Sequence, residues 1–508
     1  HEATRVGVDV LKLGGNAIDA AVAVGYALAV TDPCCGNIGG GGFMLIRLHD
    51  GRERFIDFRE RAPLRATRSM YLDARGNVRP AASRKGWLSV AVPGTVAGLE
   101  TALREFGTMS RARLLAPAVG LARDGFMFTA SDVPIPVPNA PQPGALFRQP
   151  QLAKALELIS QQGSNAFYRG SIARAVVAAS NSNGGILTMD DFTHYDVEET
   201  APLHCSFDGY EISSAPPPSS GGVVLCEILN VVAPYPLRTW GWHDLREIHY
   251  VTEAERLAYA DRNAYLGDPD FVRDPVAQLL APAYAAKLRA TIRPDRATSS
   301  IDVHPGLGPA GSEGSDTTHY SIVDRWGNAV AVTYTLNDAF GAGVIAGGTG
   351  FFLNDEMDDF TAKPGTPNMY GLVQGAANDI DPGKRPLSSM TPTIVTKNGK
   401  LRMVTGSPGG SRIPTIVLET ILNSLVYGMN AQAAVDAPRT HMQWLPDRLQ
   451  YEPLAFSDAT GEALARMGYT LRRFAQWGSA QAVVVDPHSG TLESGSDRRT
   501  PAGSAGGY

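Results

Sequence analysis

The chain has 508 residues, of which 44% are apolar and 19% charged, a composition typical of a globular protein large enough for two packed halves. A formal net charge of −6, without any cluster of Lys and Arg, excludes an electrostatic affinity for nucleic acid. The longest uncharged apolar run, residues 20–30, is roughly half the length of a membrane-spanning helix.

The four cysteines match neither a disulfide-rich scaffold nor the spacing of metal ligands. Cys34 and Cys35 are adjacent, and Cys205 and Cys226 lie much further along the chain. This pattern is compatible with an oxidising and with a reducing compartment. No secretory signal peptide is visible in the printed sequence, which opens directly on a helical pattern, so a targeting segment lost upstream is compatible with it.

In chain order, the first predicted elements are two helices separated by a Gly-Gly pair. Apolar residues recur at helical spacing over residues 6–13, and Gly14-Gly15 ends that helix. Asn16 is suited to cap a second helix over residues 17–30, and four glycines follow at 39–42. The elements predicted next are strands at 43–48 and 54–58 and helices at 94–106, 110–124, 152–161, 171–182, 222–232 and 244–265.

The most informative boundary lies where a polar linker meets a strand. Residues 293–316 are rich in Gly, Pro and Ser, which indicates an exposed linker that is open to cleavage. β-Branched residues then predict strands at 317–324 and 329–335, joined by a turn at Trp326-Gly327-Asn328. The linker therefore ends at Thr317, the first residue of a strand.

Thr317 is a candidate nucleophile. A threonine hydroxyl is weakly nucleophilic and needs a base within hydrogen-bonding distance. Cleavage between Asp316 and Thr317 would free the α-amine of Thr317, which has an ordinary pKa of about 7.7–8.0 and can act as that base. His319, on the same face of the predicted strand, is an alternative base, although a structural role is commoner for such a histidine. The simplest interpretation of Thr317-Thr318 alone is two β-formers that open a strand.

An acidic tract follows these strands, and the ordinary role of such a tract is a solvated loop. Glu356 and Asp359 are three residues apart, so both could face one cation, and Asn337 would complete that site. The planar guanidinium of Arg59 suits a carboxylate, with the hydroxyls of Ser388-Ser389 as further donors. An amino-acid zwitterion needs one acidic and one basic wall, and these residues offer both.

Four short tracts occur in a fixed order: Arg-Glu-Arg at 59–61, Thr-Thr-His-Tyr-Ser at 317–321, Pro-Leu-Ser-Ser-Met at 386–390 and Gly-Ser-Pro-Gly-Gly-Ser-Arg at 406–412. Together they resemble the bacterial γ-glutamyltranspeptidases (glutathione hydrolases), which belong to the N-terminal nucleophile hydrolase superfamily. The resemblance covers nearly the whole chain, from residue 14 to Tyr508. The chain departs from the family pattern at its start, where the pattern has a few dozen further residues, and at Asp316, where the pattern has an uncharged residue.

The resemblance implies an α/β fold, an αββα sandwich with two stacked antiparallel sheets between layers of helices. It implies a precursor that cuts itself between Asp316 and Thr317 into a large subunit, 1–316, and a small subunit, 317–508. The implied activity is transfer of the γ-glutamyl group of glutathione, or of another γ-glutamyl amide, to Thr317 and then to water, an amino acid or a dipeptide. A periplasmic or secreted location is implied, with no cofactor and no metal.

The resemblance also assigns roles to single residues. Thr335 is expected to orient the nucleophile by a hydrogen bond. Gly409 and Gly410 are expected to supply the N–H groups of an oxyanion hole, although a plain turn is the commoner role of Gly-Gly. Tyr370, in a loop at 364–371, is expected to close over bound substrate. The residues expected around the glutamyl α-amine and α-carboxylate are Arg59, Asn337, Glu356, Asp359, Ser388 and Ser389.

Three alternatives compete with this interpretation. A dinucleotide-binding protein would use Gly341-Ala342-Gly343 through Ala346, but the fingerprint requires a helix next, and the glycines of residues 347–350 oppose one. A cephalosporin or glutaryl acylase of the same superfamily would share the nucleophile but not the amino-acid pocket. A non-enzymatic binding protein would leave the junction at Thr317 unexplained.

Overall fold

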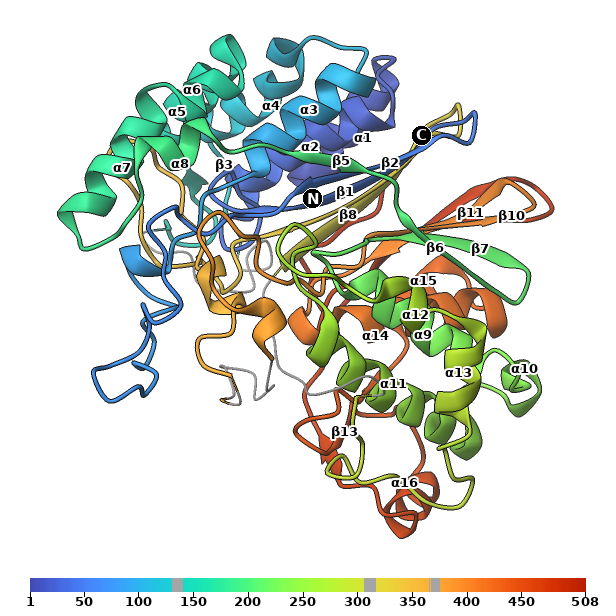
Figure 1. Ribbon diagram of the computed structural model, residues 1–508. Coiled ribbons are helices and arrows are strands. Elements are labelled where there is room, and N and C mark those ends of the chain that lie inside the picture. Colours follow the sequence, from blue (N-terminus) through green and yellow to red (C-terminus); the bar gives the residue numbers. More distant parts are fainter. Residues whose placement is uncertain (130–139, 306–316, 365, 367–374) are drawn as a thin grey trace.

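The computed structural model describes residues 1–129, 140–305, 317–364, 366 and 375–508. Its centre consists of two stacked antiparallel sheets, with strand orders β5-β2-β1-β9-β8 and β16-β15-β11-β10-β7-β6 (Figure 1). The strands of the first sheet are, in that order, Glu198–Thr200, Glu53–Phe58, Gly41–Arg47, Ala329–Thr335 and Thr317–Val323. Those of the second are Leu492–Ser496, Gln481–Val485, Lys400–Gly406, Thr393–Lys397, Tyr210–Ser214 and Leu203–Phe207.

The central strands of the first sheet have a hydrophobic core on each face. β1 and β9 are buried at every residue. Met44 and Ile46 of β1 belong to the core beneath the first helical layer, whereas Phe43 and Leu45 belong to the core on the side of the second sheet. Because successive side chains of a strand point to opposite faces, a sheet covered on both faces needs apolar residues throughout. The continuous apolar run at 43–46 meets that need.

One layer of helices covers the outer face of the first sheet (Figure 1). Its central helix, α2, is almost fully buried and packs against α1, α3 and α4 and against β8 and β9. Asn16 caps α2: its Oδ1 accepts the Asp19 N–H at 2.8 Å, and the Asp19 carboxylate accepts the Asn16 N–H at 2.9 Å. The helices of this layer are α1 Glu2–Lys12, α2 Ala17–Thr31, α3 Thr95–Phe106, α4 Arg111–Asp124, α5 Pro150–Gln162, α6 Ser164–Tyr168, α7 Ser171–Ser182 and α8 Met189–Thr193.

A second layer of helices covers the second sheet. α9 packs against β6 and β7, α14 against β11, and α15 against β15 and β16. A disulfide between Cys205 on β6 and Cys226 on α9 ties this layer to the sheet. The remaining helices are α9 Gly221–Val232, α10 Leu237–Trp240, α11 Leu245–Tyr265, α12 Val276–Leu279, α13 Pro282–Arg289, α14 Ile413–Ile421, α15 Ala431–Asp436 and α16 Asp458–Arg466. Two small sheets join β12 Thr440–His441, β13 Leu449–Tyr451 and β14 Leu471–Arg473, and β3 Phe126–Met127 with β4 Leu146–Phe147.

The αββα sandwich implied by the resemblance is confirmed, as are the strands predicted on either side of residue 326. The structure differs from the prediction over residues 198–214, where β5, β6 and β7 lie within a stretch that the sequence pattern assigned mainly to helices. These strands are short, and β5 and β6 leave several residues exposed, so no long apolar run marks them. They were missed for that reason.

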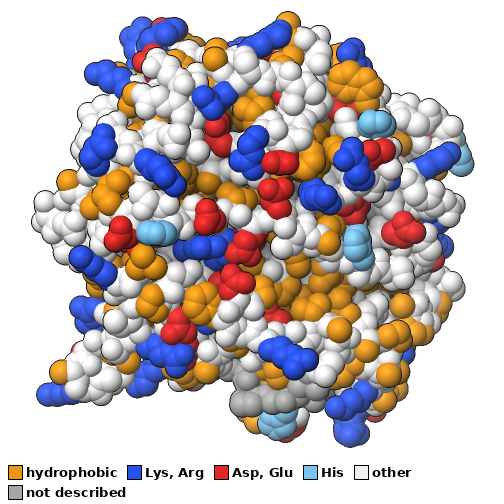
Figure 2. Space-filling view, turned by 45° about the horizontal axis from the view of Figure 1, so that its top comes forward, with side chains coloured by type: hydrophobic (Ala, Val, Ile, Leu, Met, Phe, Trp, Pro, Cys, Tyr) orange, Lys and Arg blue, Asp and Glu red, His pale blue; other side chains and the backbone are white. Residues whose placement is uncertain are grey.

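Two further predictions from composition concern the membrane and the surface. Within the described parts of the chain, no helix is both long enough and apolar enough to cross a bilayer. On the face shown in Figure 2, side chains of both charge signs are interspersed.

Candidate active site

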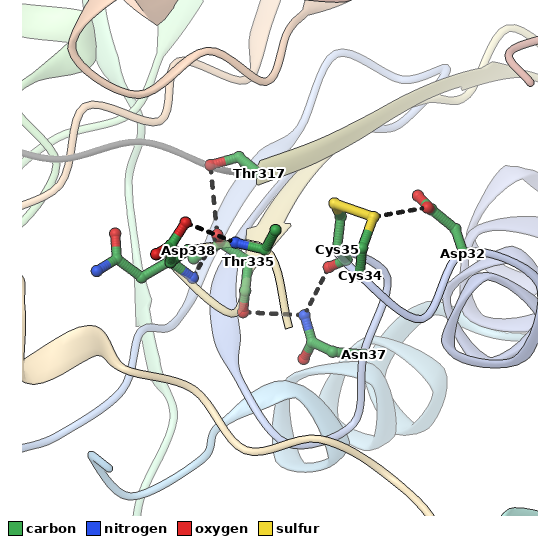
Figure 3. Close-up of a disulfide and its surroundings, with 9 residues drawn as sticks. Asp32, Cys34, Cys35, Asn37, Thr317, Thr335 and Asp338 are labelled. Atoms are coloured by element: carbon green, nitrogen blue, oxygen red, sulfur yellow. Dashed lines mark hydrogen bonds between the residues drawn. A yellow bond between two sulfur atoms is a disulfide. The ribbon is translucent and has the colours of Figure 1, made fainter. Parts of the chain in front are cut away.

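Thr317 occupies the first position of β8, the edge strand of the first sheet, opposite Thr335, the last residue of β9. Its Oγ1 lies 3.4 Å from Thr335 Oγ1, to which it donates (Figure 3). Thr335 Oγ1 also accepts the backbone N–H of Asn337 at 2.8 Å. Thr317 is only 8% exposed, so its neighbours, not solvent, direct its hydroxyl. The antiparallel register thus places a second, anchored hydroxyl beside the candidate nucleophile.

The four-glycine run predicted from the sequence explains how the chain passes this corner. The backbone at Gly40 runs so close to β9 that an added Cβ would lie 1.9 Å from the Thr335 carbonyl oxygen. Gly40 N–H donates to Asn37 Oδ1 at 2.8 Å, and Asn37 Nδ2 donates to the same Thr335 carbonyl at 2.9 Å. A side chain at residue 40 would therefore push Thr335 away from Thr317.

Thr317 opens onto a cavity of about 670 Å³. Of the predicted site residues, Thr317 and Gly409 line it. Gly409 has a φ of +144°, which residues with a side chain rarely adopt, and an added Cβ would lie 2.8 Å from Ile416 Cδ1. Gly410 begins the 3₁₀ turn Gly410–Arg412, which leads into α14. The first N–H groups of a helical segment have no partner within it, so this glycine pair sits where backbone donors are available.

Arg59 is the centre of a buried charge cluster. Its guanidinium donates to the carboxylates of Glu356 and Asp359. It also lies 3.6 Å from Glu60 Oε2 and donates to the Pro386 carbonyl at 3.1 Å. Glu356 and Asp359 begin and end one 3₁₀ turn, so their carboxylates can reach the same guanidinium.

The acidic and basic residues predicted to form the two walls of a zwitterion site contact each other. The structure joins the basic and acidic walls directly, with Arg59 completely buried. The physical reason is desolvation: a buried guanidinium is costly unless carboxylates compensate its charge. The two walls therefore neutralise each other here.

Three carboxyl groups lie around the guanidinium of Arg59. Burial raises the pKa of Glu60 to about 7, against the opposing effect of Arg59. Burial also raises the pKa of Glu356 and of Asp359, and again Arg59 opposes the shift. Among the described residues, Glu356 Oε2 and Asp359 Oδ1 have no hydrogen-bond partner. The cluster therefore keeps acceptor atoms that a further donor could use.

Ser388 and Ser389 follow the backbone that contacts Arg59, because Leu387 carries the carbonyl that accepts from Arg59 Nη2 at 3.2 Å. Ser388 is held by its own backbone: its carbonyl accepts the Ser220 N–H at 2.7 Å, and its Oγ accepts the Met390 N–H at 3.1 Å. Ser389 Oγ is buried and has no partner among the described residues. It is a free hydroxyl near the charge cluster.

Asn337 links the nucleophile to the acidic tract. Its N–H donates to Thr335 Oγ1, and its Nδ2 donates to the Asp355 carbonyl at 3.1 Å, one residue before Glu356. Asn337 has a φ of +77°, a conformation that asparagine tolerates better than most residues. The predicted residues thus form two neighbouring groups, one around Thr317 and one around Arg59, joined by Asn337.

His319, the alternative base, has a structural environment. Its Nδ1 lies 2.8 Å from Thr333 Oγ1 and its Nε2 lies 3.0 Å from Ser321 Oγ. Burial lowers its pKa to about 3, so the ring is neutral. Since both ring nitrogens are occupied by hydroxyls other than that of Thr317, the geometry favours the structural role.

Sequence reasoning missed three polar residues of the charge cluster: Glu60, Asn378 and Arg262. Asn378 Nδ2 donates to the Asp359 carbonyl at 2.6 Å, and its Oδ1 accepts the Leu387 N–H at 3.0 Å. Arg262 is buried in α11 and donates to Ser220 Oγ at 3.1 Å. Glu60 could have been found from its place beside Arg59. Arg262 lies within a helix and Asn378 ends a short 3₁₀ turn, and the sequence around neither of them marks a binding site.

Two predicted residues, Asp316 and Tyr370, lie outside the described residues. The dinucleotide-binding alternative is wrong in its structural requirement, because turns and not a helix follow Gly343. Within the part of the chain that the structure describes, Asp32, Cys34 and Cys35 are close enough together to ligate a metal, but the two cysteines are joined in a disulfide.

Comparison with known proteins gives one family. The family model described as Gamma-glutamyltranspeptidase matches residues 3–507. The chain is 55% identical over 488 residues to the glutathione hydrolase proenzyme of Pseudomonas sp. (strain A14), covering 92% of this chain and 84% of the relative. It is 47% identical over 527 residues to the glutathione hydrolase proenzyme of Escherichia coli (strain K12), covering 100% of this chain and 90% of the relative.

Among solved structures, cephalosporin acylase from Bacillus halodurans superposes with a TM-score of 0.86 at 28% identity, covering 98% of this chain and 93% of the other. A chain of the Helicobacter pylori γ-glutamyltranspeptidase matches with a TM-score of 0.58 at 43% identity, covering 60% of this chain and 94% of the other. The fold is thus shared by both kinds of enzyme, whereas the higher sequence identities are to glutathione hydrolases.

Proposed function

Since the chain belongs to the γ-glutamyltranspeptidase family, we propose that it transfers γ-glutamyl groups from glutathione and related amides with Thr317 as its nucleophile. The observation that carries the assignment of the nucleophile is the contact between the Thr317 and Thr335 hydroxyls at the first residue of β8. An N-terminal threonine at that position would present its amine and its hydroxyl to the same cavity.

The proposed maturation cuts the bond between Asp316 and Thr317. The Thr317 hydroxyl attacks the Asp316 carbonyl carbon, and the peptide C–N bond breaks, which leaves residues 1–316 as an ester on Thr317 Oγ1. Water then hydrolyses that ester and releases the carboxyl group of Asp316. Residues 1–316 then form the large subunit and 317–508 the small one. The Helicobacter pylori chain supports this division, because 94% of it matches only 60% of this chain, about the share that 1–316 makes up.

In the proposed reaction, the free amine of Thr317 takes the proton of the Thr317 hydroxyl as the oxygen attacks the γ-carbonyl carbon. The N–H groups of Gly409 and Gly410 stabilise the oxyanion, and Thr335 holds the nucleophile in line. The leaving amine takes the proton, which completes a γ-glutamyl ester on Thr317. Water, an amino acid or a dipeptide then attacks that ester and regenerates the threonine.

The Arg59 cluster is the proposed site for the glutamyl head group. The α-carboxylate takes the place of an acidic partner on Arg59, and the α-ammonium takes the place of Arg59 on Glu356 and Asp359. Asn337, Ser388 and Ser389 complete the site, and Tyr370 closes over it. The support lies in the unused acceptors of Glu356 and Asp359 and the unpartnered hydroxyl of Ser389.

A second candidate is an acylase, since the chain is 37% identical over 516 residues to the acylase ACY 1 proenzyme of Pseudomonas sp. (strain SE83). A glutaryl amide lacks the α-ammonium, so binding it would leave Glu356 and Asp359 uncompensated. The Arg59 cluster therefore favours the γ-glutamyl substrate. We also propose a periplasmic or secreted location, which the two disulfides support.

The test compares a γ-glutamyl anilide with the matching glutaryl anilide on the purified protein. We expect a preference for the γ-glutamyl compound of roughly thirtyfold or more in kcat/KM. Adding glycylglycine should accelerate release of the aniline. Equal kcat/KM values for the two anilides would replace the proposed function with the acylase.

A further inference from the structure

The turn between α2 and β1 carries a disulfide between neighbouring residues, Cys34 and Cys35. Both line the cavity onto which Thr317 opens. We propose that this pair is a thiol–disulfide exchange site that reacts with small thiols entering the cleft, and that its state alters the position of Thr335. The exchange chemistry needs neither Thr317 nor the proposed γ-glutamyl transfer, so each can be tested without the other.

The two cysteines differ in exposure, and we infer the direction of exchange from that difference. Cys34 is 1% exposed, whereas Cys35 is partly exposed. A small thiolate therefore attacks Cys35 Sγ, and a new S–S bond joins the thiol to Cys35 as the Cys34–Cys35 bond breaks. The electron pair of the broken bond passes to Cys34 Sγ, which takes up the proton lost by the incoming thiol.

Asp32 is placed to receive that new thiol. Its Oδ1 lies 3.2 Å from Cys34 Sγ and can accept the S–H hydrogen bond (Figure 3). A second small thiol then attacks the small-molecule sulfur of the mixed disulfide. This step releases the disulfide of the small thiol and leaves Cys35 as a thiol. The sum is one protein disulfide and two thiols converted to two protein thiols and one small disulfide, with no other reagent.

The backbone of the pair is linked by hydrogen bonds to the nucleophile corner, the place where Thr317 and Thr335 lie opposite each other. The Cys35 carbonyl accepts from Asn37 Nδ2 at 3.1 Å, and the same nitrogen donates to the Thr335 carbonyl at 2.9 Å (Figure 3). On the other side, the Phe340 N–H donates to the Cys34 carbonyl at 3.0 Å. The closed ring limits the backbone conformations at 34–35. Opening the ring gives the Cys35 carbonyl more freedom, and with it Asn37, whose Nδ2 donates to both the Cys35 and the Thr335 carbonyls. Thr335 in turn contacts Thr317.

The second disulfide provides an internal control. Cys226 is fully buried in the core beneath the second sheet, and its partner Cys205, on β6, is partly exposed, as Cys35 is. Unlike Cys34 and Cys35, neither of these two cysteines lines the cavity onto which Thr317 opens. A reagent that reaches the Cys34–Cys35 pair through the cavity should therefore spare Cys205–Cys226 in the folded protein.

The experiment incubates the folded protein without oxygen in graded concentrations of 2-mercaptoethanol, quenches with acid, alkylates the free thiols and measures the cysteine peptides by mass spectrometry. We expect Cys34–Cys35 to be reduced at a thiol concentration about tenfold or more below that needed for Cys205–Cys226. Thr317→Ala should behave in the same way. In the single variants the reagent is instead the disulfide of 2-mercaptoethanol: Cys34→Ser should gain one 2-mercaptoethanol on Cys35 by exchange and release one 2-mercaptoethanol as thiol, and Cys35→Ser should react roughly tenfold more slowly at Cys34.

Reduction of both disulfides only together would overturn the exchange site, as would faster modification of Cys34 than of Cys35 in the single variants. A second readout tests the coupling to Thr335. With a γ-glutamyl anilide, the reduced protein should have a kcat roughly fivefold lower than the oxidised protein, and reoxidation by the disulfide of 2-mercaptoethanol should restore it. A double Cys34→Ala, Cys35→Ala variant should not respond to thiols. Equal kcat values in both states would overturn the coupling, while the peptide masses would still decide the exchange.

Discussion

The nucleophile corner and the Arg59 cluster are neighbours, yet they are built by different means. Thr317 and Thr335 are uncharged and are positioned by the register of two paired strands. Arg59, Glu356 and Asp359 come from separate tracts and are held together by buried ion pairs. Strand register positions the first group whether or not a ligand is present. In the second group, the charges of Arg59, Glu356 and Asp359 compensate one another, so a charged ligand must break these ion pairs to bind.

This difference predicts how each region responds to substitution. A change in the corner should lower the rate of the chemical step and leave binding almost unchanged, because the strands persist. A change in the cluster should alter which substrates bind and how stable the protein is.

Replacing the nucleophile gives the largest effect. Thr317→Ala should remain a single uncut chain and lose activity by about 10⁴-fold or more, because it removes the hydroxyl proposed to form the ester. Denaturing gels and anilide hydrolysis measure the two effects. Thr317→Ser is the matched control and should be cut slowly. Normal cutting of Thr317→Ala would mean that another protease makes the cut, and the corner would lose its proposed role in maturation.

The cluster should control the choice of substrate. Asp359→Asn removes one carboxylate from Arg59 and from the proposed ammonium site. We expect a loss of roughly thirtyfold to several thousandfold in kcat/KM for a γ-glutamyl anilide, and little change for the glutaryl anilide. Arg61→Ala, two residues from Arg59 and paired with Glu198 at 3.0 Å, is the control and should preserve the preference. An equal loss on both anilides would show a general defect instead of recognition of the amine.

Thr335→Val tests the corner without adding or removing charge. Valine keeps the shape and the buried strand position but removes the hydroxyl beside Thr317. We expect kcat to fall about 10- to 100-fold with KM nearly constant. Thr333→Val, on the same strand and next to His319, is the matched control for stability. A rise in KM with constant kcat would assign Thr335 to binding and erase the distinction between the two regions.

The smallest effect concerns pH and Glu60. Burial raises the pKa of Glu60 to about 7, above its ordinary value of 4.5, so the folded state binds this proton more tightly than the unfolded state. The contribution to stability is therefore fully present below about pH 4.5 and is lost as the pH rises to 7. Glu60→Gln should remove this slope and raise the Tm at pH 8, relative to the parent protein, by about 1–3 °C. Tm curves at pH 5 and pH 8 measure it, and parallel curves for the two proteins would contradict it.

The corner could be predicted from the sequence because its causes are local. A Gly/Pro/Ser linker, a β-branched run and a turn at Trp326-Gly327-Asn328 together place Thr317 at a strand start and Thr335 at the end of its partner. The resemblance supplied their roles and the sandwich of sheets, which periodicity alone showed only as mixed α/β. The short strands within 198–214 carry too few alternating residues to be recognised.

The main residues of the Arg59 cluster could be predicted from the sequence, but the direct ion pairs between them could not. Charges of opposite sign at Arg59 and Asp359 indicate a site for a zwitterion, yet nothing in the sequence says that they lie in direct contact. That contact follows from burial, which depends on the whole fold. For the same reason, the partnership of Asn378 with Asp359 and Leu387 could be seen only in three dimensions.

The order of strands in the two sheets has a consequence for the mature protein. In the first sheet, β5, β2 and β1 precede residue 317, and β9 and β8 follow it; in the second, β7 and β6 precede it and the other four follow. A cut before Thr317 would therefore sever the polypeptide while leaving every ladder of both sheets intact. The two products contribute strands to both sheets, so their separation would require the backbone hydrogen bonds between neighbouring strands to break in each sheet. The cleaved molecule should therefore unfold as one unit, and its subunits should not dissociate on dilution.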